Sequence, residues 1–289
     1  NPSNQYWLDT NMVFTVFDTG GRDTLDFSTV RQTQTIRLTE NTLSSVGGYS
    51  LNMNIARDTV IENAIGGRGR DLIVGNHVSN RLTGGNGDDT LRGGNGNDSL
   101  LGGAGADIFQ GGDGRDTVIF TENVAIQVNL SRGGRQSTGM GSDSFASIEN
   151  VTSGGRNDVL TGNAVANALN GMGGNDRLSG AAGADTLSGG AGRDTLDGGA
   201  GYDRLLGGSG ADTFRFASGR DVVVDFVNDV DSIGFDRDIW GGARLSTAQI
   251  LQFASIVGGN AVFDFENGAM LTVRGVSRLS HLNDDIFTY

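Results

Sequence analysis

The sequence predicts an all-β protein in which short parallel strands wind into stacked coils. The 289 residues include 49 Gly, 1 Pro and no Cys, which excludes collagen-like and disulfide-framework proteins and favours a repeating, turn-rich architecture. Asp or Asn recurs every nine residues, and an apolar residue follows two positions after each. A phase kept over so many units indicates a repeat fold. The repeat position is Asp71, Asn80, Asp89, Asp98, Asp107 and Asp116 in a first block, and Asp158, Asn167, Asp176, Asp185, Asp194, Asp203 and Asp212 in a second.

Each unit reads Gly-Gly-x-Gly-x-Asp-x-apolar-x, most clearly at 84–92. Glycine is expected in the turn because a tight turn repeated this often visits positive φ angles. The x-apolar-x stretch is a minimal strand whose central side chain faces one way. We therefore expect six residues to turn and three to extend. Two units form one coil, and stacked coils give two parallel sheets around a thin apolar core, with Gly-Asp turns along both edges.

The repeat aspartates predict a calcium-binding protein. Stacked coils lie about 4.8 Å apart, so the carboxylates on one edge would repel by about 1 to 3 kcal/mol per neighbouring pair. A divalent cation between turns reverses this repulsion. Carboxylate and carbonyl oxygens suit Ca²⁺, whereas no zinc is expected because the chain has no Cys and only His77 and His281. Merely solvated turn aspartates are the alternative, but turn propensity does not explain the phase.

Two consequences follow from the calcium interpretation. Folding and calcium binding are expected to be one event, because the core is thin and the metal-free ladder repels. One ion per pair of facing turns gives about eight to twelve ions.

Charge and hydropathy exclude other classes of partner. A net charge of −13 argues against nucleic acid, whose binding needs Lys and Arg on the phosphates. No apolar run approaches the roughly 20 residues of a membrane span, so no transmembrane segment is expected. No signal-peptide pattern opens the chain, and a start at Asn1 rather than Met is expected for an excised or processed fragment.

The nine-residue repeat resembles that of RTX proteins, the haemolysin-type calcium-binding family. The resemblance implies a parallel β-roll that is unfolded in the calcium-poor cytosol and folds outside the cell after type I secretion. It also implies calcium ligation by the second and fourth turn residues, through their carbonyls, and by the Asp carboxylate. The turn residues that this marks are Gly67, Gly69, Asp71, Gly84, Gly85, Asn86, Gly87, Asp89, Gly93, Gly94, Asn95, Gly96, Asp98, Gly102, Gly103, Ala104, Gly105, Asp107, Gly111, Gly112, Gly114 and Asp116 in the first block, and Asp158, Gly171, Gly173, Asp176, Gly180, Gly183, Asp185, Gly189, Gly190, Gly192, Asp194, Gly198, Gly199, Gly201, Asp203, Gly207, Gly208, Gly210 and Asp212 in the second.

The N-terminal third narrows the resemblance. DTGGRDTLDFS at 18–28, VGG at 46–48 and VIENAIGG at 60–67 resemble the stretch that follows the catalytic domain in serralysin-type (M10) zinc metalloproteases. This implies an extra calcium ion held by Asp18, Gly20, Gly21 and Asp23 and closed by the backbone of Val60 and the carboxylate of Glu62. The family more often has Thr at the position of Val60, and a carbonyl ligand would survive that change.

The chain as given is not expected to be an enzyme. HExxHxxGxxH, the zinc-binding motif of such proteases, does not occur in the sequence, and neither does the Gly-x-Ser-x-Gly elbow of lipases. We therefore predict no catalytic residue and expect a separate or cleaved catalytic domain as a partner.

A longer duplication overlies the nine-residue repeat. Ile-Glu-Asn occurs at 61–63 and again at 148–150, each time before a block of repeats. By this correspondence Glu149 is expected to do for the second block what Glu62 does for the first, with Asp116 in the place of Asp23. The alternative is a solvated glutamate at a strand end.

Past Phe216 the repeat is expected to stop and a terminal cap to begin. Asp225 and Asp231, with Asp221, resemble the last calcium site of the family, with a simply acidic loop as the alternative. Thr247 is expected to cap a short helix, and Asn-Gly at 267–268 predicts a hairpin. The last six residues, DDIFTY, resemble uncleaved export signals, and a docked final strand is the alternative.

These observations divide the chain into an N-terminal β segment (1–65), a first β-roll (66–120), a connecting strand segment (121–152), a second β-roll (153–216) and a C-terminal cap with the secretion signal (217–289). The predicted function is calcium-triggered extracellular folding and type I secretion of a serralysin-like protein. A stand-alone adhesion or binding module, and the accessory region of another RTX enzyme such as a lipase or epimerase, are the alternatives.

Overall fold

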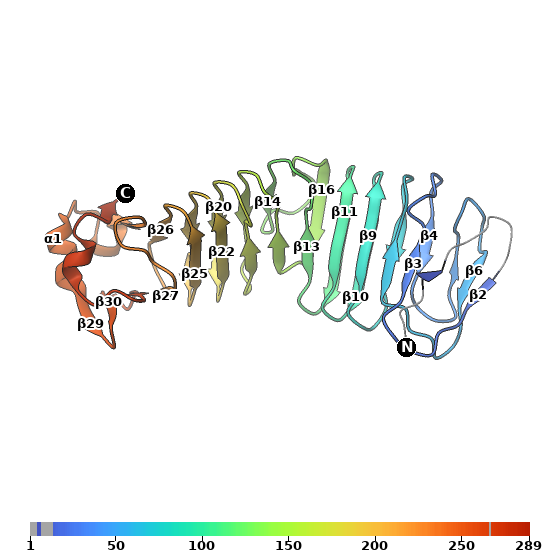
Figure 1. Cartoon of the computed structure of the whole chain (residues 1–289), viewed down its shortest axis with the longest axis horizontal. Coiled ribbons are helices and arrows are strands. Elements are labelled where there is room, and N and C mark those ends of the chain that lie inside the picture. The colour runs from blue at the N-terminus through green and yellow to red at the C-terminus, as the bar shows by residue number, and fades with distance from the viewer. Residues whose placement is uncertain (1–4, 7–13, 266) are drawn as a thin grey trace. The chain divides into compact units, whose positions relative to one another are not determined.

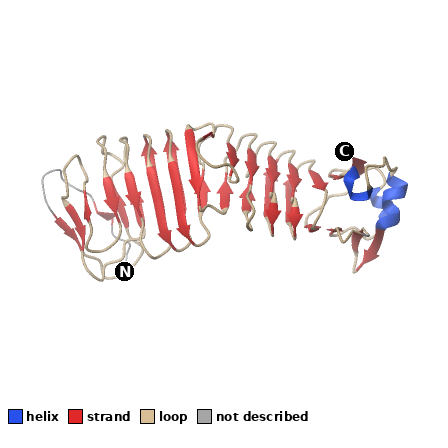
Figure 2. Ribbon diagram, turned by 180° about the vertical axis from the view of Figure 1, so that it is seen from behind, coloured by secondary structure: helices blue, strands red, loops and turns tan. Residues whose placement is uncertain are grey.

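The computed structural model describes residues 5–6, 14–265 and 267–289 (Figure 1), which fall into two compact units. The first unit comprises residues 1–122 and 132–150, and the second comprises 123–131 and 151–289. Short strands run through both units, and the few helices lie near the C-terminus (Figure 2). The predicted all-β class of parallel coils is confirmed.

In the first unit, successive coils place their strands in two parallel sheets. One sheet contains β1 (Gln5–Tyr6), β3 (Thr24–Asp26), β7 (Asn63–Ile65), β9 (Arg81–Asn86), β11 (Ser99–Ala104) and β13 (Thr117–Ile119). The other contains β4 (Thr35–Arg37), β8 (Leu72–Val74), β10 (Thr90–Asn95), β12 (Ile108–Asp113) and β16 (Ser142–Ala146), with β15 (Gln136–Ser137) antiparallel to β16. A third, small sheet joins β2 (Phe14–Val16), β6 (Met53–Ile55) and β5 (Leu43–Ser44).

The second unit repeats this plan. One sheet orders β19 (Ala168–Asn170), β22 (Thr186–Ala191), β25 (Arg204–Ser209), β27 (Arg220–Val223), β31 (Met270–Val273), β30 (Asn260–Asp264) and β29 (Ala254–Val257). The other orders β14 (Gln127–Asn129), β18 (Val159–Thr161), β20 (Arg177–Ser179), β23 (Thr195–Asp197), β26 (Thr213–Phe216), β28 (Ser232–Phe235) and β32 (Ile286–Thr288). A minor pair is β21 (Ala182–Gly183) with β24 (Ala200–Gly201), and β17 (Asn150–Thr152) lies where the units meet in the sequence.

The core is the predicted thin apolar layer between the two sheets. The residue two positions after each repeat Asp or Asn is at most 1% exposed, as for Leu91 and Phe109. These two residues are also register partners in adjacent strands, so each coil places its apolar residue on that of the coil before. Burial of one such side chain contributes about 1.5 to 3 kcal/mol, which makes the stacked column the main apolar contribution to stability.

The strands are longer than expected in several units. β9 runs from Arg81 to Asn86 and continues through the first two glycines of the turn, because Gly85 pairs with Gly103 in the next coil. The expectation of three extended residues per unit is therefore wrong here, since paired backbones extend the ladder into the turn.

The C-terminal segment forms a cap with its own aromatic core. β29, β30 and β31 are antiparallel neighbours, as the predicted hairpin requires. The short helix α1 (Thr247–Ile250) begins after Ser246 rather than after Thr247, because the Gln249 side chain accepts the Ser246 backbone N–H at 2.9 Å. The remaining helices are η1 (Arg237–Trp240), η2 (Leu251–Phe253) and η3 (Leu279–Leu282).

The last residues form the docked strand that was one of the two expectations for them. Ile286 pairs with Ile233 in a parallel arrangement of β32 and β28. Aromatic rings pack around this end of the unit, with the Phe235 and Phe263 centroids 5.0 Å apart. Within the described residues, no helix has the length and apolar character that a membrane span requires.

Candidate metal-binding ladders

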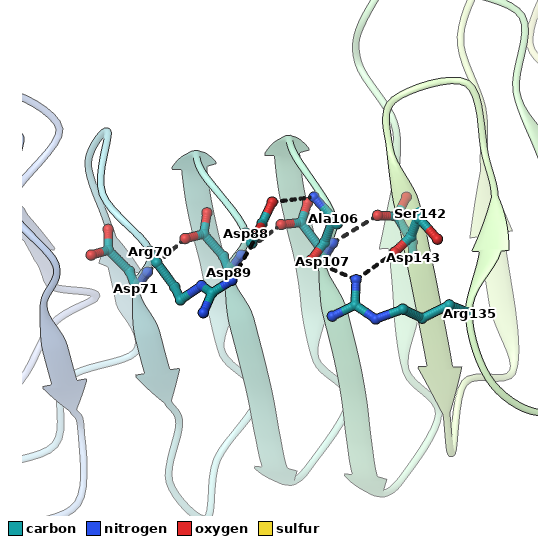
Figure 3. Close-up of polar contacts among 9 residues, drawn as sticks. All are labelled: Arg70, Asp71, Asp88, Asp89, Ala106, Asp107, Arg135, Ser142 and Asp143. Carbon is teal, nitrogen blue, oxygen red and sulfur yellow. Dashed lines mark hydrogen bonds and ion pairs between the residues drawn. The ribbon is translucent and has the colours of Figure 1, made fainter.

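The repeat aspartates form ladders along the edges of the coils. In each rung, one carboxylate oxygen accepts the backbone N–H of the repeat residue one coil earlier. Asp71 donates to Asp89 Oδ1 at 2.7 Å, Asp89 to Asp107 Oδ1 at 2.8 Å, and Asp107 to Asp143 Oδ1 at 2.8 Å. Figure 3 shows these four carboxylates following one another across the turns. The Asp side chain thus connects neighbouring coils directly.

The same bond recurs on the other edges of both units. In the first unit, Asn80 donates to Asp98 and Asp98 to Asp116. The two ladders of the second unit are Asp158, Asp176, Asp194, Asp212 and Asp231 on one edge, and Asn167, Asp185, Asp203 and Asp221 on the other.

Sequence reasoning did not assign two members of these ladders to the repeat, although it named Asp221 as part of a candidate C-terminal calcium site. The repeat does not stop at Phe216, because Asp203 N–H donates to Asp221 Oδ1 at 3.2 Å. Asp221 lies nine residues after Asp212, so the spacing itself was a usable signal. Asp143 lies four repeat lengths after Asp107 and has the apolar Phe145 two positions later, so the spacing was again a usable signal. The Phe145 ring stacks on Phe109 at 5.3 Å.

The ladder carboxylates are buried, and burial raises their pKa. Asp89, Asp107 and Asp176 are 1 to 2% exposed. Desolvation, with repulsion from neighbouring carboxylates, raises the pKa of each from 3.8 to about 7. By contrast, the Ala106 N–H and Arg70 lower the pKa of the exposed Asp88, whose carboxylate lies 3.0 Å from the Arg70 guanidinium. Adjacent aspartates in one turn therefore have opposite preferences for charge.

The second oxygen of many ladder carboxylates has no protein partner. Among the residues that the structure describes, Oδ2 is buried without a hydrogen bond in Asp89, Asp98, Asp116, Asp176, Asp185, Asp194 and Asp212. A buried, unsatisfied acceptor is destabilising by about 1 to 3 kcal/mol, and more when it is charged. A row of such oxygens is a set of acceptors that could hold a cation.

Glycine is required where one turn lies on another. Gly87 has φ of 128°, and a Cβ there would lie 2.1 Å from the Gly69 carbonyl oxygen of the preceding coil. Gly85 meets the Gly67 carbonyl oxygen at 2.2 Å in the same way. The glycines therefore bring carbonyl oxygens of one turn against the next turn, beside the buried carboxylates. Such an all-oxygen donor set fits a hard cation, and a site of about six or more oxygens suits calcium.

The duplicated Ile-Glu-Asn segments have matching geometry. Asp23 N–H donates to Glu62 Oε2 at 2.8 Å, and Asp116 N–H donates to Glu149 Oε2 at 2.9 Å. In both places the following Asn donates its backbone N–H to the same Asp carbonyl, at 3.0 Å from Asn63 and at 2.9 Å from Asn150. The structure thus brings Glu149 and Asp116 together within the first unit.

The remaining N-terminal residues of the predicted site lie nearer the surface. The Asp18 carboxylate accepts the Gly20 N–H at 2.7 Å, and the Asp18 N–H lies 3.4 Å from Thr59 Oγ1. Gly20 and Gly21 are exposed, whereas Val60 is half-buried.

At the C-terminal end, Asp225 and Asp231 both bind backbone N–H groups. Asp225 accepts from Gly207 at 3.0 Å and from Gly208 at 2.9 Å. Asp231 accepts from Asp212 and Val227 at 2.9 Å and 2.8 Å. Asp231 therefore ends a ladder, while Asp225 holds the turn of the preceding coil.

Parallel coils with buried carboxylate ladders between glycine turns define the class as a β-roll of the RTX type. The chain belongs to the Peptidase M10 serralysin C-terminal family, whose model matches residues 7–274. The resemblance seen in the N-terminal third is therefore confirmed. The family description names the C-terminal region of serralysins and not their catalytic domain.

Curated relatives match over a quarter of the chain. This chain is 52% identical over 74 residues to a serralysin of Photorhabdus laumondii, and the match covers 26% of this chain and 15% of the relative. It is 54% identical over 69 residues to the metallopeptidase AprA of Pseudomonas marginalis, covering 24% and 14%. The chain thus spans about one seventh of the length of each of these relatives. Among solved structures, the extracellular lipase LipA of Serratia marcescens matches with a TM-score of 0.35 and 22% identity, covering 80% of this chain and 40% of that chain.

We expect Gly87→Ala to destabilise the protein by at least about 2 kcal/mol, because the Cβ would be strained at positive φ and would collide with the Gly69 carbonyl. Gly133→Ala is the matched control, since nothing lies within 4 Å of its Cβ position. Chemical denaturation in the presence of calcium measures the free energy of unfolding of both variants. Equal stability of the two variants would contradict the stacked-turn geometry.

The raised pKa of Asp89, Asp107 and Asp176 predicts how metal-free stability depends on pH. Their folded pKa is about 7 and their ordinary value is 3.8, so the folded state favours the protonated form. This contribution is fully present below pH 3.8 and is lost as the pH rises through about 7. In chelator, circular dichroism should therefore show more strand at about pH 5.5 than at about pH 8. Equal or weaker strand signal at the lower pH would contradict this pH dependence.

Proposed function

We propose that this chain is the calcium-binding, non-enzymatic C-terminal region of a secreted serralysin-type metalloprotease. The observation that carries the proposal is the row of buried Oδ2 atoms without hydrogen-bond partners beside glycine carbonyls. Calcium would supply positive charge to these oxygens and join consecutive turns. The residues that would hold it are the ladder aspartates and the carbonyls of the second and fourth turn residues.

The charge distribution supports coupling of folding to calcium. The chain carries 34 acidic against 21 basic side chains, and its ladder aspartates are buried against one another. Without a cation these aspartates must be protonated or must repel. The apolar core is only one residue deep per strand, and it offers little to offset that repulsion. The roll would therefore remain largely unfolded where calcium is scarce.

This coupling supports a role in export. A chain that stays unfolded in a calcium-poor cytosol can be threaded through the type I secretion machinery, and calcium outside the cell would then trigger folding. The family assignment supports a secreted protein with a separate catalytic domain, since it covers only the C-terminal region of serralysins. Zinc chemistry and proteolysis would belong to that other domain, because this sequence has no HExxHxxGxxH.

Calcium removal tests the proposal. Far-ultraviolet circular dichroism of the full chain should show most of its strand signal with calcium and lose most of it in chelator at pH about 7.5, where the ladder carboxylates ionise. Magnesium at the same concentration is the control, because it keeps its water and fits the turns poorly. A spectrum that does not change on chelation at this pH would refute the coupling.

Glu149→Gln tests the duplicated site. The change removes the charge of the carboxylate that accepts the Asp116 N–H. We expect the calcium-dependent stability to fall by about 1 to 3 kcal/mol. Glu122→Gln is the matched control, because Glu122 is half-buried, as Glu149 is, and accepts only the neighbouring Thr121 N–H among the bonds shown. Melting curves at several calcium concentrations give the comparison. Indistinguishable curves for the two variants would remove Glu149 from the proposed sites.

A further inference from the structure

Two turns depart from the glycine pattern in the same way. Residues 75–80 read Gly-Asn-His-Val-Ser-Asn, and residues 162–167 read Gly-Asn-Ala-Val-Ala-Asn. Both have Asn at the second and sixth positions and Val at the fourth, and each is the second turn of its block. The same triple replacement in two blocks indicates a common structural task.

In the first unit, the two asparagines close the turn on each other. Asn76 N–H donates to Asn80 Oδ1 at 2.8 Å, and Asn80 Nδ2 donates back to Asn76 Oδ1 at 3.2 Å. Val78 N–H also donates to Asn76 Oδ1, at 3.1 Å. The two side-chain amides also donate to backbone carbonyls of the preceding coil. Asn80 Nδ2 donates to Glu62 O at 3.0 Å, and Asn76 Nδ2 donates to Ile61 O at 2.8 Å.

In the second unit, the same three bonds within the turn recur. Asn163 N–H donates to Asn167 Oδ1 at 2.8 Å, and Asn167 Nδ2 donates to Asn163 Oδ1 at 3.2 Å. Val165 N–H donates to Asn163 Oδ1 at 3.0 Å. Both sixth-position asparagines are buried, with Asn80 2% and Asn167 1% exposed.

The backbone of these two turns differs from that of the next turn on the same edge, which has positive φ at 94 and 96 in the first unit and at 181 and 183 in the second. Gly94 and Gly96 have φ of 114° and 105°, and the nearby Asp98 Oδ2 is buried without a partner. Asn76, Val78, Asn163 and Val165 all avoid positive φ, as β-branched Val in particular must. A sixth-position amide also presents N–H donors where a carboxylate would present acceptors. The donor set is therefore unsuited to a cation.

We propose that turns 75–80 and 162–167 bind no calcium and are closed instead by their own side-chain amides. The residues at the second, fourth and sixth positions then decide whether a turn requires the ion. This inference rests on the proposed calcium function for the other turns, and it divides the turns of the roll into ion-dependent and ion-independent ones.

The amide-closed turns are placed to support the next calcium turn on the same edge. Asn80 N–H donates to Asp98 Oδ1, and Asn167 N–H donates to Asp185 Oδ1, both at 2.7 Å. In each block, an aspartate of a glycine turn is thus bonded to a backbone held by amides. As calcium is withdrawn, the amide-closed turns should lose their hydrogen bonds later than the glycine turns.

A reciprocal exchange of turn residues tests the inference in the full chain. Asn76→Gly with Val78→Gly and Asn80→Asp creates a glycine-aspartate turn, and Gly94→Asn with Gly96→Val and Asp98→Asn creates an amide turn. Equilibrium dialysis with calcium, followed by elemental analysis, counts the bound ions. We expect the first variant to gain about one ion per chain and the second to lose about one, since each ion lies between a pair of turns. Unchanged counts in folded variants would overturn the inference.

Hydrogen exchange on the unmodified chain provides a test that does not depend on the variants folding. As chelator withdraws calcium stepwise, the Val78 and Val165 amides should lose protection at a lower calcium concentration than Gly96, which donates to Asp113 O. Equal loss of protection at all three amides overturns the inference. A chain that binds no calcium at all overturns the proposed function itself, whereas calcium located at either amide-closed turn by anomalous scattering overturns only the present inference.

Discussion

The structure depends on one interaction, the bond from a backbone N–H to the buried Asp carboxylate of the next coil. Its two partners are eighteen residues apart, as in the bond from Asp71 to Asp89, so each bond fixes the pitch of one full coil. The same carboxylate has a second oxygen that faces no hydrogen-bond donor in many of the described turns. One side chain therefore sets the stacking of the coils and also presents a buried acceptor for the cation that we propose. On that proposal, fold and metal binding are linked because they use the same atoms.

Glycine makes this arrangement sterically possible. At Gly87 the backbone both adopts positive φ and lies over a carbonyl oxygen of the preceding coil, where a Cβ would be only 2.1 Å away. A side chain would separate the turns, and the carbonyls would no longer lie beside the carboxylates. The abundance of glycine in this chain thus reflects close contact between successive turns as well as the freedom of the backbone.

The ladder drawn in Figure 3 ends on protein groups. At one end of the ladder in Figure 3, Asp71 accepts the N–H groups of Gly67 and Gln34, both at 2.7 Å. At the other end, Asp143 accepts the Thr138 hydroxyl, and Arg135 donates to the Ser142 carbonyl at 2.9 Å. Hydrogen bonds from the chain thus satisfy the two terminal carboxylates of this ladder, while the inner Asp89 retains an unsatisfied Oδ2. This ladder is therefore a bounded stack.

The sequence by itself determined the repeat, the buried apolar column and the acidic ladder. A nine-residue period gives the residues equivalent to Asp89 and Leu91 the same place in every coil, whatever lies around them. The pairing of Glu62 with Asp23 could also be anticipated by family resemblance. Only the tertiary structure decided which in-phase residue comes next in a ladder where the repeat is interrupted. Asp107 bonds to Asp143, four repeat lengths later, because β15 and β16 return the chain to the edge of the roll after an irregular segment. The spacing alone does not say that this segment leaves the coil and returns in phase, since that depends on how the whole segment packs against the finished coils.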